Sequence, residues 1–420
     1  MNEEAIKTPS RIEADYLIET AIDPIQAAEI MAGEQSSGTF RAVPGETPEL
    51  KARAGARVER LVALGRVDAP SLPGGTKGTS WTRAEVTLSW PLDNIGPSLP
   101  NLIATIAGNL FELKPFSGVR LMDVRLPAAF AQRYSGPKFG MAGTRNLSGV
   151  YDRPLVGTII KPSVGLSAQE TGALVSQLCE GGIDFIKDDE LQADGPACPF
   201  EDRVRAVMAA VDRSADKTGR KAMVAFNLTG EIDEMRARHD LVSDLGGTCV
   251  MVSLNAVGMS GVVELARHTT LPIHAHRCGW GALTRDPMLG WSYPAWSKLW
   301  RLAGADHMHV NGLDNKFSEA NESVIASAQS LSDPLFADAP MRAVPVFSSG
   351  QTVRQAAGTL AATGSPDLIV TAGGGVVAHP DGIESGVMAM RQAWDAAMQG
   401  VDIEVYAKEY PALASALKAY

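Results

Sequence analysis

Residues 182–190 combine a short apolar run with one lysine and three consecutive acids, in the order GIDFIKDDE. Side chains on a strand alternate between its two faces, so Lys187 and Asp189 point to the same side, and Glu190 follows where the strand ends. Three neighbouring carboxylates repel one another unless a positive charge lies among them. Mg²⁺, which prefers oxygen ligands, would relieve that repulsion. A charged surface loop is the alternative, and the surrounding elements must decide between the two.

Short β-rich runs alternate with helical patterns through the last two thirds of the chain, as parallel βα units do. Eight such units in about 250 residues match the size of a (β/α)8 TIM barrel. An open, doubly wound sheet is the alternative, but no Gly-x-Gly-x-x-Gly follows the first run. We therefore predict a closed barrel. Its strands are expected at residues 155–161, 183–188, 222–228, 249–254, 272–276, 306–310, 344–348 and 367–372.

The predicted strands end in polar residues. In a TIM barrel the functional groups lie at the C-terminal ends of the strands, so these side chains should converge on one rim. That convergence favours a metal site at residues 182–190 over a surface loop. In strand order the rim residues are Lys161; Lys187, Asp189 and Glu190; Asn227 and Thr229; Asn255; His276 and Arg277; His309 and Asn311; Ser348, Ser349 and Gly350; and Gly373, Gly374 and Gly375.

The loops after the seventh and eighth strands suggest phosphate binding. Ser349-Gly350 and Gly373-Gly374 allow the backbone to approach an anion closely. Tight turns without a ligand are the alternative reading of these glycines. Lys316, in a loop with the glycine and asparagine of a movable lid, is expected to reach over such a phosphate.

Residues 1–140 are predicted to form a smaller α+β, ferredoxin-like domain, and residues 141–420 the barrel with a C-terminal helical tail. Asp23-Pro24 has the residue types of a helix start, with Asp23 as the cap. Strands are expected at 56–67, 81–90 and 118–126, and a helix at 101–111. The resulting strand–helix–strand–strand–helix–strand order suits a split βαβ sandwich.

Bulk properties exclude several classes of protein. The net charge of -10 argues against a nucleic-acid or anionic-membrane partner. No apolar stretch reaches the roughly 18 residues of a transmembrane helix. Residues 1–4 are acidic and no secretory signal is predicted, so we expect a cytoplasmic protein. The four cysteines lack the spacing of a zinc site, and we expect reduced thiols, with Cys278 packed rather than exposed.

Several motifs, in their order along the chain, resemble the large subunit of RuBisCO over nearly the whole sequence. The most specific is GGIDFIKDDE at 181–190, which resembles the activation motif of that family. The others are GTIIKPSVGLS at 157–167, HAHR at 274–277, GADHMH at 304–309, Lys316, SSG at 348–350 and GGG at 373–375.

This resemblance implies a homodimer or an oligomer of dimers, because residues 34–40 and 107–109 are similar to segments that complete the partner's site. The partner-supplied residues would be Glu34, Thr39, Phe40 and Asn109. No small subunit is expected.

The resemblance also implies roles for individual residues. Lys187 would react with CO2, and its carbamate would bind Mg²⁺ together with Asp189 and Glu190. Lys161 would move a proton at the reacting carbon, with His276 beside the metal and Lys316 closing over the substrate. Phosphate and hydroxyl groups would be held by Arg277, His309, Ser348, Ser349, Gly350, Gly373 and Gly374.

Four positions depart from the carboxylating enzymes. Ser163 stands where they carry a second lysine, Phe40 where a tryptophan is expected, Trp280 where they carry a further histidine, and Asn315 where the mobile loop has a glycine. The resemblance is therefore to a RuBisCO-like (type IV) protein without carboxylase activity.

We expect a Mg²⁺-dependent lyase that forms a metal-bound enediolate from a phosphorylated keto-sugar acid. The preferred reaction is decarboxylation of 3-oxo-isoapionate 4-phosphate, from apiose breakdown, to a tetrulose phosphate, because the methionine-salvage enolases of this family lack the equivalents of His276-Arg277 and Lys316. The alternatives are such an enolase or isomerase acting on a methylthio-pentulose-type phosphate, a transcarboxylase/hydrolase of the same branched acid, a non-catalytic sugar-phosphate-binding barrel, or a ribulose-bisphosphate carboxylase.

Overall fold

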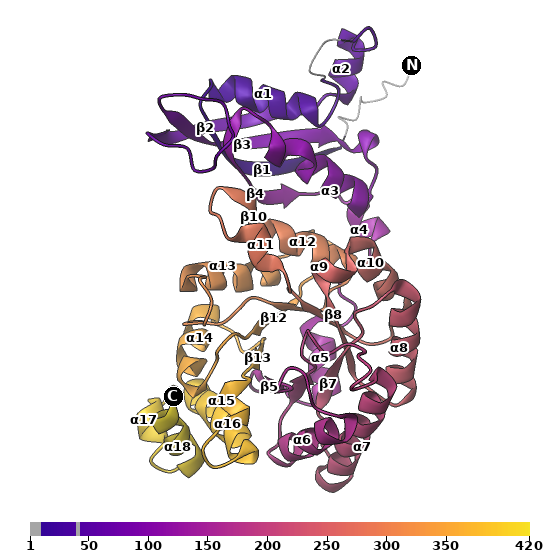
Figure 1. The fold of residues 1–420 in the computed structure, drawn as a ribbon, viewed down its shortest axis with the longest axis vertical. Helices are drawn as coiled ribbons and strands as arrows, with labels where there is room; N and C mark the ends of the chain where they lie inside the picture. The colour runs from indigo at the N-terminus through magenta and orange to yellow at the C-terminus, as the bar shows by residue number, and fades with distance from the viewer. Residues whose placement is uncertain (1–9, 39–42) are drawn as a thin grey trace. The chain divides into compact units, whose positions relative to one another are not determined.

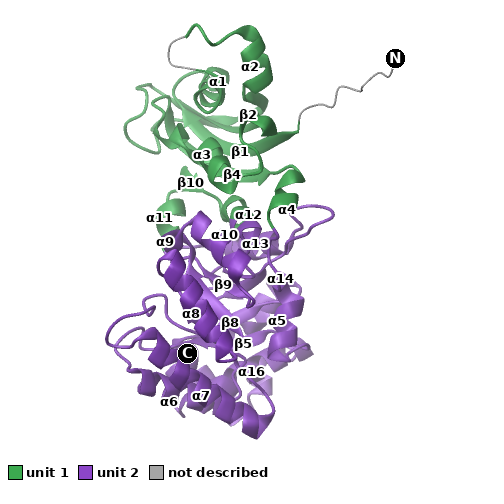
Figure 2. Cartoon of the chain, turned by 90° about the vertical axis from the view of Figure 1, so that its right-hand side faces the viewer, with its two compact units in different colours: residues 1–134, 279–299 green, residues 135–278, 300–420 purple. Residues whose placement is uncertain are grey.

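The structure, a computed structural model, describes residues 10–38 and 43–420 (Figure 1). Thr39 and Phe40, predicted to complete a partner's site, lie outside the described residues. The chain divides into two compact units (Figure 2). Unit 1 contains residues 1–134 and 279–299, and unit 2 contains residues 135–278 and 300–420. The segment 279–299, which follows the fifth predicted barrel strand, thus belongs to unit 1, which the sequence did not indicate.

Unit 1 is built on a five-stranded sheet in the order β10-β4-β1-β3-β2. The predicted order of strands and helices is confirmed, with α1 after β1 and α3 between β3 and β4. Alternate residues of β1 are buried, as expected for a strand with one covered face. The elements are β1 Arg11–Thr20, α1 Pro24–Glu34, α2 Pro48–Ala54, β2 Arg57–Val67, β3 Trp81–Pro91, η1 Leu92–Asn94, α3 Leu99–Ala107, η2 Asn109–Glu112, β4 Phe116–Arg125, α4 Ala129–Arg133, α11 Trp280–Thr284 and β10 Leu289–Trp291.

Local sequence signals explain most of these boundaries. The Asp23 carboxylate accepts hydrogen bonds from the N–H groups of Ile25 (2.8 Å) and Gln26 (3.2 Å), which confirms the predicted cap of α1. The helix predicted at 101–111 is wrong at its end, because Gly108 leaves the helical backbone and Asn109 begins a separate turn. The parallel pairing of β10 with β4 was not predicted, since a three-residue strand carries no readable alternation.

Unit 2 contains the predicted closed barrel of eight parallel strands, in the order β11-β12-β13-β5-β6-β7-β8-β9. Helices surround it, and α18 packs against α16 at the end of the chain (Figure 1). The strands are β5 Leu155–Ile159, β6 Phe185–Lys187, β7 Met223–Asn227, β8 Cys249–Ser253, β9 Ile273–His276, β11 His307–His309, β12 Val344–Phe347 and β13 Ile369–Thr371. The helices are α5 Gly140–Ser148, α6 Ala168–Glu180, α7 Phe200–Thr218, α8 Ile232–Asp244, α9 Leu254–Val257, α10 Met259–His268, α12 Tyr293–Ala303, which begins in unit 1, α13 Asn321–Ser332, η3 Val353–Gln355, α14 Ala356–Thr363, α15 Gly374–Val377, α16 Ile383–Gln399, α17 Ile403–Tyr406 and α18 Pro411–Ala419.

Helix α5 closes the N-terminal end of the barrel. Its Met141 and Leu147 pack against the apolar barrel interior. Asp306, which directly precedes β11, accepts hydrogen bonds from the N–H groups of Phe139 (2.7 Å) and Gly140 (3.0 Å). The opposite, C-terminal end of the barrel carries the polar strand ends. Among the described residues, no helix combines the length and apolar character needed to cross a membrane.

Candidate active site

Lys187 is the last residue of β6 and lies inside the barrel, with only 1% of its surface exposed. Its ammonium nitrogen is 3.4 Å from a carboxylate oxygen of Glu190. Burial lowers the pKa of Lys187, and the nearby Glu190 and Asp189 only partly offset that effect. The structure thus presents a buried lysine with an increased neutral fraction, which is the form that reacts as a nucleophile.

Asp188 points to the other side of β6. Its carboxylate lies 3.2 Å from the Arg203 guanidinium on α7 and accepts a hydrogen bond from the Asn227 N–H (3.0 Å). Both members of this ion pair are buried. Asp188 therefore joins β6 to α7 and β7, whereas Lys187 and Asp189 share the inner side, as strand alternation predicted.

We expect Asp188→Asn to lower the free energy of unfolding by about 3 kcal/mol, because it leaves the Arg203 guanidinium buried without its counter-charge. Chemical denaturation would measure this. Asp212→Asn is a matched control, since Asp212 pairs with Lys221 at the surface and the loss should stay below about 1 kcal/mol. Equal losses in the two variants would contradict a structural role for the buried pair.

Lys161, just beyond β5, pairs with Asp189. Its Nζ lies 2.6 Å from Asp189 Oδ2 and 2.8 Å from Ser163 Oγ, and 39% of its side chain is exposed. Burial tends to raise the pKa of Asp189, but hydrogen bonds from Lys161, the Leu191 N–H and Ser163 outweigh burial and lower it. Ser163, the position at which the carboxylating enzymes that the motifs resemble carry a second lysine, thus places a hydroxyl against this pair.

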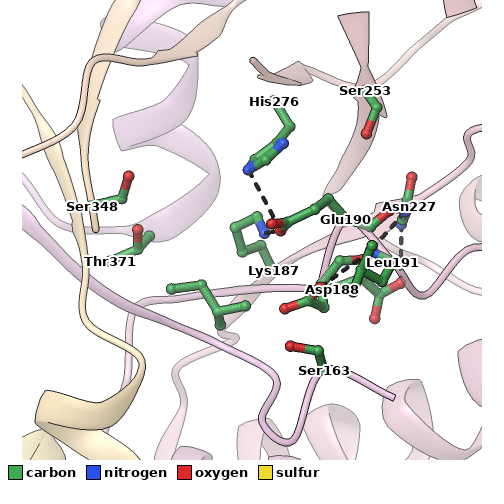
Figure 3. A network of polar contacts seen from close by, with 12 residues as sticks. Ser163, Lys187, Asp188, Glu190, Leu191, Asn227, Ser253, His276, Ser348 and Thr371 are labelled. Carbon is green, nitrogen blue, oxygen red and sulfur yellow. Dashed lines mark hydrogen bonds and ion pairs between the residues drawn. The ribbon is translucent and has the colours of Figure 1, made fainter. Parts of the chain in front are cut away.

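His276, the last residue of β9, lies beside Glu190, with 3.5 Å between its Nε2 and a Glu190 oxygen (Figure 3). Burial and the nearby Lys187 lower the pKa of His276 to about 3, so the imidazole is neutral at physiological pH. Its buried Nδ1 has no hydrogen-bond partner within the described part of the chain. Because unpaired buried polar atoms are rare, this nitrogen marks a ligand position.

Ser348 and Ser349 follow β12. Figure 3 shows Ser348 across the barrel opening from Lys187. The Ser348 hydroxyl is 3.1 Å from Nδ1 of His309, the last residue of β11. The Ser349 hydroxyl donates to the side-chain oxygen of Asn311 (2.7 Å). Ser349 has a positive φ of 72° and Gly350 one of 88°, so the loop turns sharply at the rim.

Lys316 and the two glycine loops also meet at this rim. The Lys316 N–H donates to the Ser349 carbonyl (3.2 Å), and a Cβ on Gly350 would lie 3.5 Å from the Lys316 backbone nitrogen. A Cβ on Gly373 would come within 3.6 Å of the Lys161 side chain. The loops after β11, β12 and β13 are therefore close-packed against one another or against Lys161.

Arg277 is held by Glu319, which sequence reasoning missed. The guanidinium lies 2.7 Å from a Glu319 oxygen, and the same oxygen accepts a hydrogen bond from the Asn311 amide (2.7 Å). Only the fold brings Glu319 to this place, since it lies 42 positions from Arg277. Ser253 at the end of β8 was also missed, and its buried hydroxyl has no partner among the described residues. Strand alternation alone would have suggested Ser253.

Cys278 is exposed, so the prediction of a packed thiol is wrong, whereas the other three cysteines are buried. The residue follows the end of β9 and precedes Gly279, which turns the chain with a φ of 79°. Its backbone carbonyl accepts a hydrogen bond from the Asn255 amide (2.7 Å), which satisfies the main chain while the thiol faces solvent.

Glu34 and Asn109 both lie on the surface of unit 1. Glu34 ends α1 and Asn109 begins η2. The end of α1 and the start of η2 are neighbours, because a Cβ on Gly108 would lie 2.9 Å from the side-chain nitrogen Nε2 of Gln35. Their contribution to a partner's site stays a prediction.

A second group of possible metal ligands, His239, Asp240 and His268, lies on α8 and α10. Both ring nitrogens of His239 are already engaged, Nδ1 with Asp240 (2.9 Å) and Nε2 with the Thr270 N–H (3.2 Å). His268 also contacts Asp240 (2.6 Å). This group is a closed hydrogen-bonded cluster and offers His239 no free lone pair for a metal.

The residues around Lys187 do fit Mg²⁺. Asp189 and Glu190 supply carboxylate oxygens, which this hard ion prefers. Their present counter-charges are Lys161 and Lys187. Conversion of the Lys187 amine into an anionic carbamate would replace one of those positive charges by a third oxygen ligand, and the cation would restore the balance.

Comparisons with known proteins agree with this geometry. Residues 7–130 match the family "Ribulose bisphosphate carboxylase large chain, N-terminal domain", and residues 140–420 match the corresponding catalytic domain. The chain is 62% identical over 407 residues to a 3-oxo-isoapionate-4-phosphate transcarboxylase/hydrolase of Xanthobacter autotrophicus, which covers 97% of this chain and 98% of that protein. It is 42% identical over 411 residues to a 3-oxo-isoapionate-4-phosphate decarboxylase of Rhizobium etli, covering 97% of this chain and 96% of that protein.

A solved structure shows the same fold. The crystal structure of a rubisco-like protein from Burkholderia fungorum is similar with a TM-score of 0.92 at 48% identity, over 98% of this chain and 100% of that one. The resemblance inferred from the motifs is thereby confirmed. Two family domains cover nearly the whole described sequence, and the barrel carries the lysine and carboxylates of the activation motif at the end of its second strand. The chain belongs to the ribulose bisphosphate carboxylase large-chain family and is a RuBisCO-like protein.

Proposed function

We propose that this protein acts on 3-oxo-isoapionate 4-phosphate and breaks the bond to its carboxylate carbon. The observation that carries the proposal is the 62% identity to the Xanthobacter autotrophicus transcarboxylase/hydrolase of that compound. The pairing of Lys161 with Asp189 beside the buried Lys187 supports it, because the reaction needs positive charge near the substrate and a group that can carry a proton.

The chemistry follows from the substrate's name. In a 3-oxo acid the carboxylate is carried by the carbon next to the ketone, so its departure as CO2 leaves a pair of electrons on that carbon that the ketone oxygen can accept. An enzyme therefore has to stabilise negative charge on that oxygen and to control protons at the carbon. Lys161 is the proposed proton carrier, because its ammonium lies at the rim and is partly exposed.

Lys187 as its carbamate, with Asp189 and Glu190, would hold Mg²⁺ in this proposal. Bound there, the ion would supply a Lewis acid that polarises the substrate's ketone. The lowered pKa of Lys187, caused chiefly by burial, supports carbamate formation, because only a neutral amine attacks CO2. His276, neutral and adjacent to Glu190, would orient a substrate oxygen through its ring.

The opposite side of the opening would bind the phosphate and hydroxyl groups. Backbone N–H groups of the glycine loops after β12 and β13 suit a phosphate, and Lys316 packs on the first of them. In this proposal the substrate or its phosphate contacts Arg277, Ser348, Ser349, Gly350, Gly373 and Gly374, and His309 acts through the Ser348 hydroxyl, which lies 3.1 Å from its Nδ1.

Two outcomes follow from the same bond cleavage. The first is transfer of the carboxyl group followed by hydrolysis, which the 62% identity to the Xanthobacter autotrophicus enzyme favours. The second is decarboxylation to a tetrulose phosphate, the reaction preferred from the sequence alone, and the 42% identity to the Rhizobium etli decarboxylase supports it. NMR of the products from the purified enzyme with 3-oxo-isoapionate 4-phosphate separates them. Decarboxylation gives CO2 and one four-carbon phosphate, whereas transfer followed by hydrolysis takes up one water and keeps the carboxyl carbon in an acid product without net release of CO2.

The same assay can overturn the proposal. Turnover of 2,3-diketo-5-methylthiopentyl 1-phosphate without any turnover of the branched acid would assign the protein to methionine salvage. Incorporation of labelled CO2 into ribulose bisphosphate would instead show a carboxylase, and we expect none, since Ser163 replaces the second lysine of the strand-one motif.

We further propose a homodimer in which Glu34 and Asn109 act in the partner's site. Asn109→Ala and Lys187→Met, each inactive alone, should then complement each other after unfolding and remixing. Random pairing of subunits gives about one quarter of the sites intact, because only mixed dimers contain one site free of both changes. We expect the remixed sample to recover about that fraction of the unmodified enzyme's activity, and light scattering would check that it has the mass of a dimer. No recovery from a confirmed mixed dimer would show that each subunit builds its site alone.

A further inference from the structure

A continuous hydrogen-bonded chain runs through the barrel interior from α5 to the rim. It contains Thr144 on α5, His307 and His309 on β11, His274 on β9, and Ser348 after β12. All five are buried. The successive contacts are Thr144 Oγ1 to His307 Nε2 (2.7 Å), His307 Nδ1 to His274 Nδ1 (3.4 Å), His274 Nε2 to His309 Nε2 (2.7 Å) and His309 Nδ1 to Ser348 Oγ (3.1 Å).

Each histidine in this chain carries one ring proton. Burial lowers the pKa of His307 to about 3, and burial together with neighbouring rings and Lys187 lowers the pKa values of His274 and His309 well below the usual range. A neutral imidazole has one nitrogen that donates and one that accepts. Once the proton of one ring is placed, the protons of the other two follow.

The inner end of the chain sets the direction. The Thr144 hydroxyl lies 2.6 Å from the Gly140 carbonyl and donates to it. Two oxygens cannot approach so closely without a hydrogen between them. Because its proton is used there, the Thr144 oxygen has to accept from His307 Nε2–H. His307 Nδ1 then accepts from His274, His274 Nε2 accepts from His309, and His309 Nδ1 accepts from the Ser348 hydroxyl.

We propose that Thr144, His307 and His274 are positioning residues that fix the ring proton of His309 on Nε2 and turn the Ser348 hydroxyl proton away from the barrel opening. None of the three is assigned a role by the reaction proposed above. The consequence at the rim is specific: the Ser348 oxygen offers lone pairs, so it accepts from a substrate hydroxyl and does not donate to a phosphate oxygen.

The hydroxyl proton of the neighbouring Ser349 is also held by a hydrogen bond inside the protein, in this case to Asn311. Its hydroxyl donates to the Asn311 side-chain oxygen (2.7 Å). The orientation of the Asn311 amide is fixed in turn, because its nitrogen donates to the Glu319 carboxylate (2.7 Å), which also binds Arg277. The two serine oxygens also lie 3.3 Å from each other, but each proton is used in a shorter contact, with His309 (3.1 Å) or with Asn311 (2.7 Å). Both serine hydroxyls therefore present acceptor oxygens, and the subsite selects a sugar hydroxyl.

Neutron diffraction on deuterated crystals of the unmodified protein tests the proton order without any substrate. We expect deuterium on His307 Nε2, His274 Nδ1, His309 Nε2 and Ser348 Oγ, the last pointing at His309. Deuterium on His309 Nδ1 would overturn the proposal. This result does not depend on the substrate, so failure of the proposed reaction and failure of this inference can be told apart.

Kinetics with 3-oxo-isoapionate 4-phosphate, which rest on the proposed function, test the consequence. Thr144→Val removes the anchoring hydroxyl, and we expect KM to rise about tenfold with kcat little changed, as for the loss of one hydrogen bond equally present in ground and transition states. Thr144→Ser keeps the hydroxyl and should restore KM. Thr171→Val is the matched control, because the Thr171 hydroxyl donates to the carbonyl four residues back at the start of α6, and no hydrogen bond joins it to a histidine among the described residues. A KM in Thr144→Val equal to that of Thr171→Val would contradict the positioning role.

Discussion

Replacement of Lys187 by methionine is expected to lower kcat/KM by about 10³-fold, which corresponds to about 4 kcal/mol of lost transition-state stabilisation. The amine is proposed to become the carbamate ligand of Mg²⁺, and methionine can neither react with CO2 nor bind a hard cation. A loss of several kcal/mol is what removal of a Lewis acid from a polarised ketone produces.

The same substitution should not destabilise the fold. Methionine fills a volume similar to that of lysine. The substitution also removes the buried amine of Lys187, whose charged form is costly to desolvate. We expect the thermal midpoint to stay the same or to rise, measured by circular dichroism. Lys217→Met on the exposed face of α7 is the matched control and should leave kcat/KM unchanged.

Dependence on Mg²⁺ and bicarbonate completes this test. Activity of the unmodified enzyme should fall after chelation and after removal of CO2, and should return when both are added. Activity that does not change when Mg²⁺ and CO2 are removed or added back would rule out the carbamate. That conclusion would hold even if Lys187→Met were inactive, because the Lys187 amine could then act without forming a carbamate.

Alternation on β6 shows why so much of the site was predictable. Strand geometry alone placed Lys187 and Asp189 on one side, and the structure pairs both with groups inside the barrel opening. The eight strands were found because each is a short apolar run between helical patterns, and a closed barrel then forces their ends together. Neither step needed knowledge of distant contacts.

Several contacts of the site escaped prediction because they join residues that are separated in the sequence. Arg203 neutralises Asp188 from α7, and Glu319 holds Arg277 across 42 positions. Thr144 meets His307 across 163 positions, so the proton order of the histidines has no local signature. The strand β10 escaped for another reason, since three residues are too few to show a period.

Lys161→Met is expected to lower kcat by between about 10² and 10⁴, the range usual for loss of a general acid or base. Lys161 lies 2.6 Å from Asp189 and at the rim, so it can serve in two ways: as the proton carrier at the reacting carbon, or as a fixed positive charge that orients a metal ligand. Rate measurements on a single variant do not separate these roles.

Lys161→Arg separates them. Arginine keeps the positive charge beside Asp189 but does not release its proton in proteins, because its pKa lies above about 12. A proton-carrier role predicts that the arginine variant is as impaired in kcat as the methionine variant, while its Mg²⁺ affinity stays near that of the unmodified enzyme. Recovery of kcat in Lys161→Arg would instead show that the positive charge alone is required, and the proton would then have to come from another group.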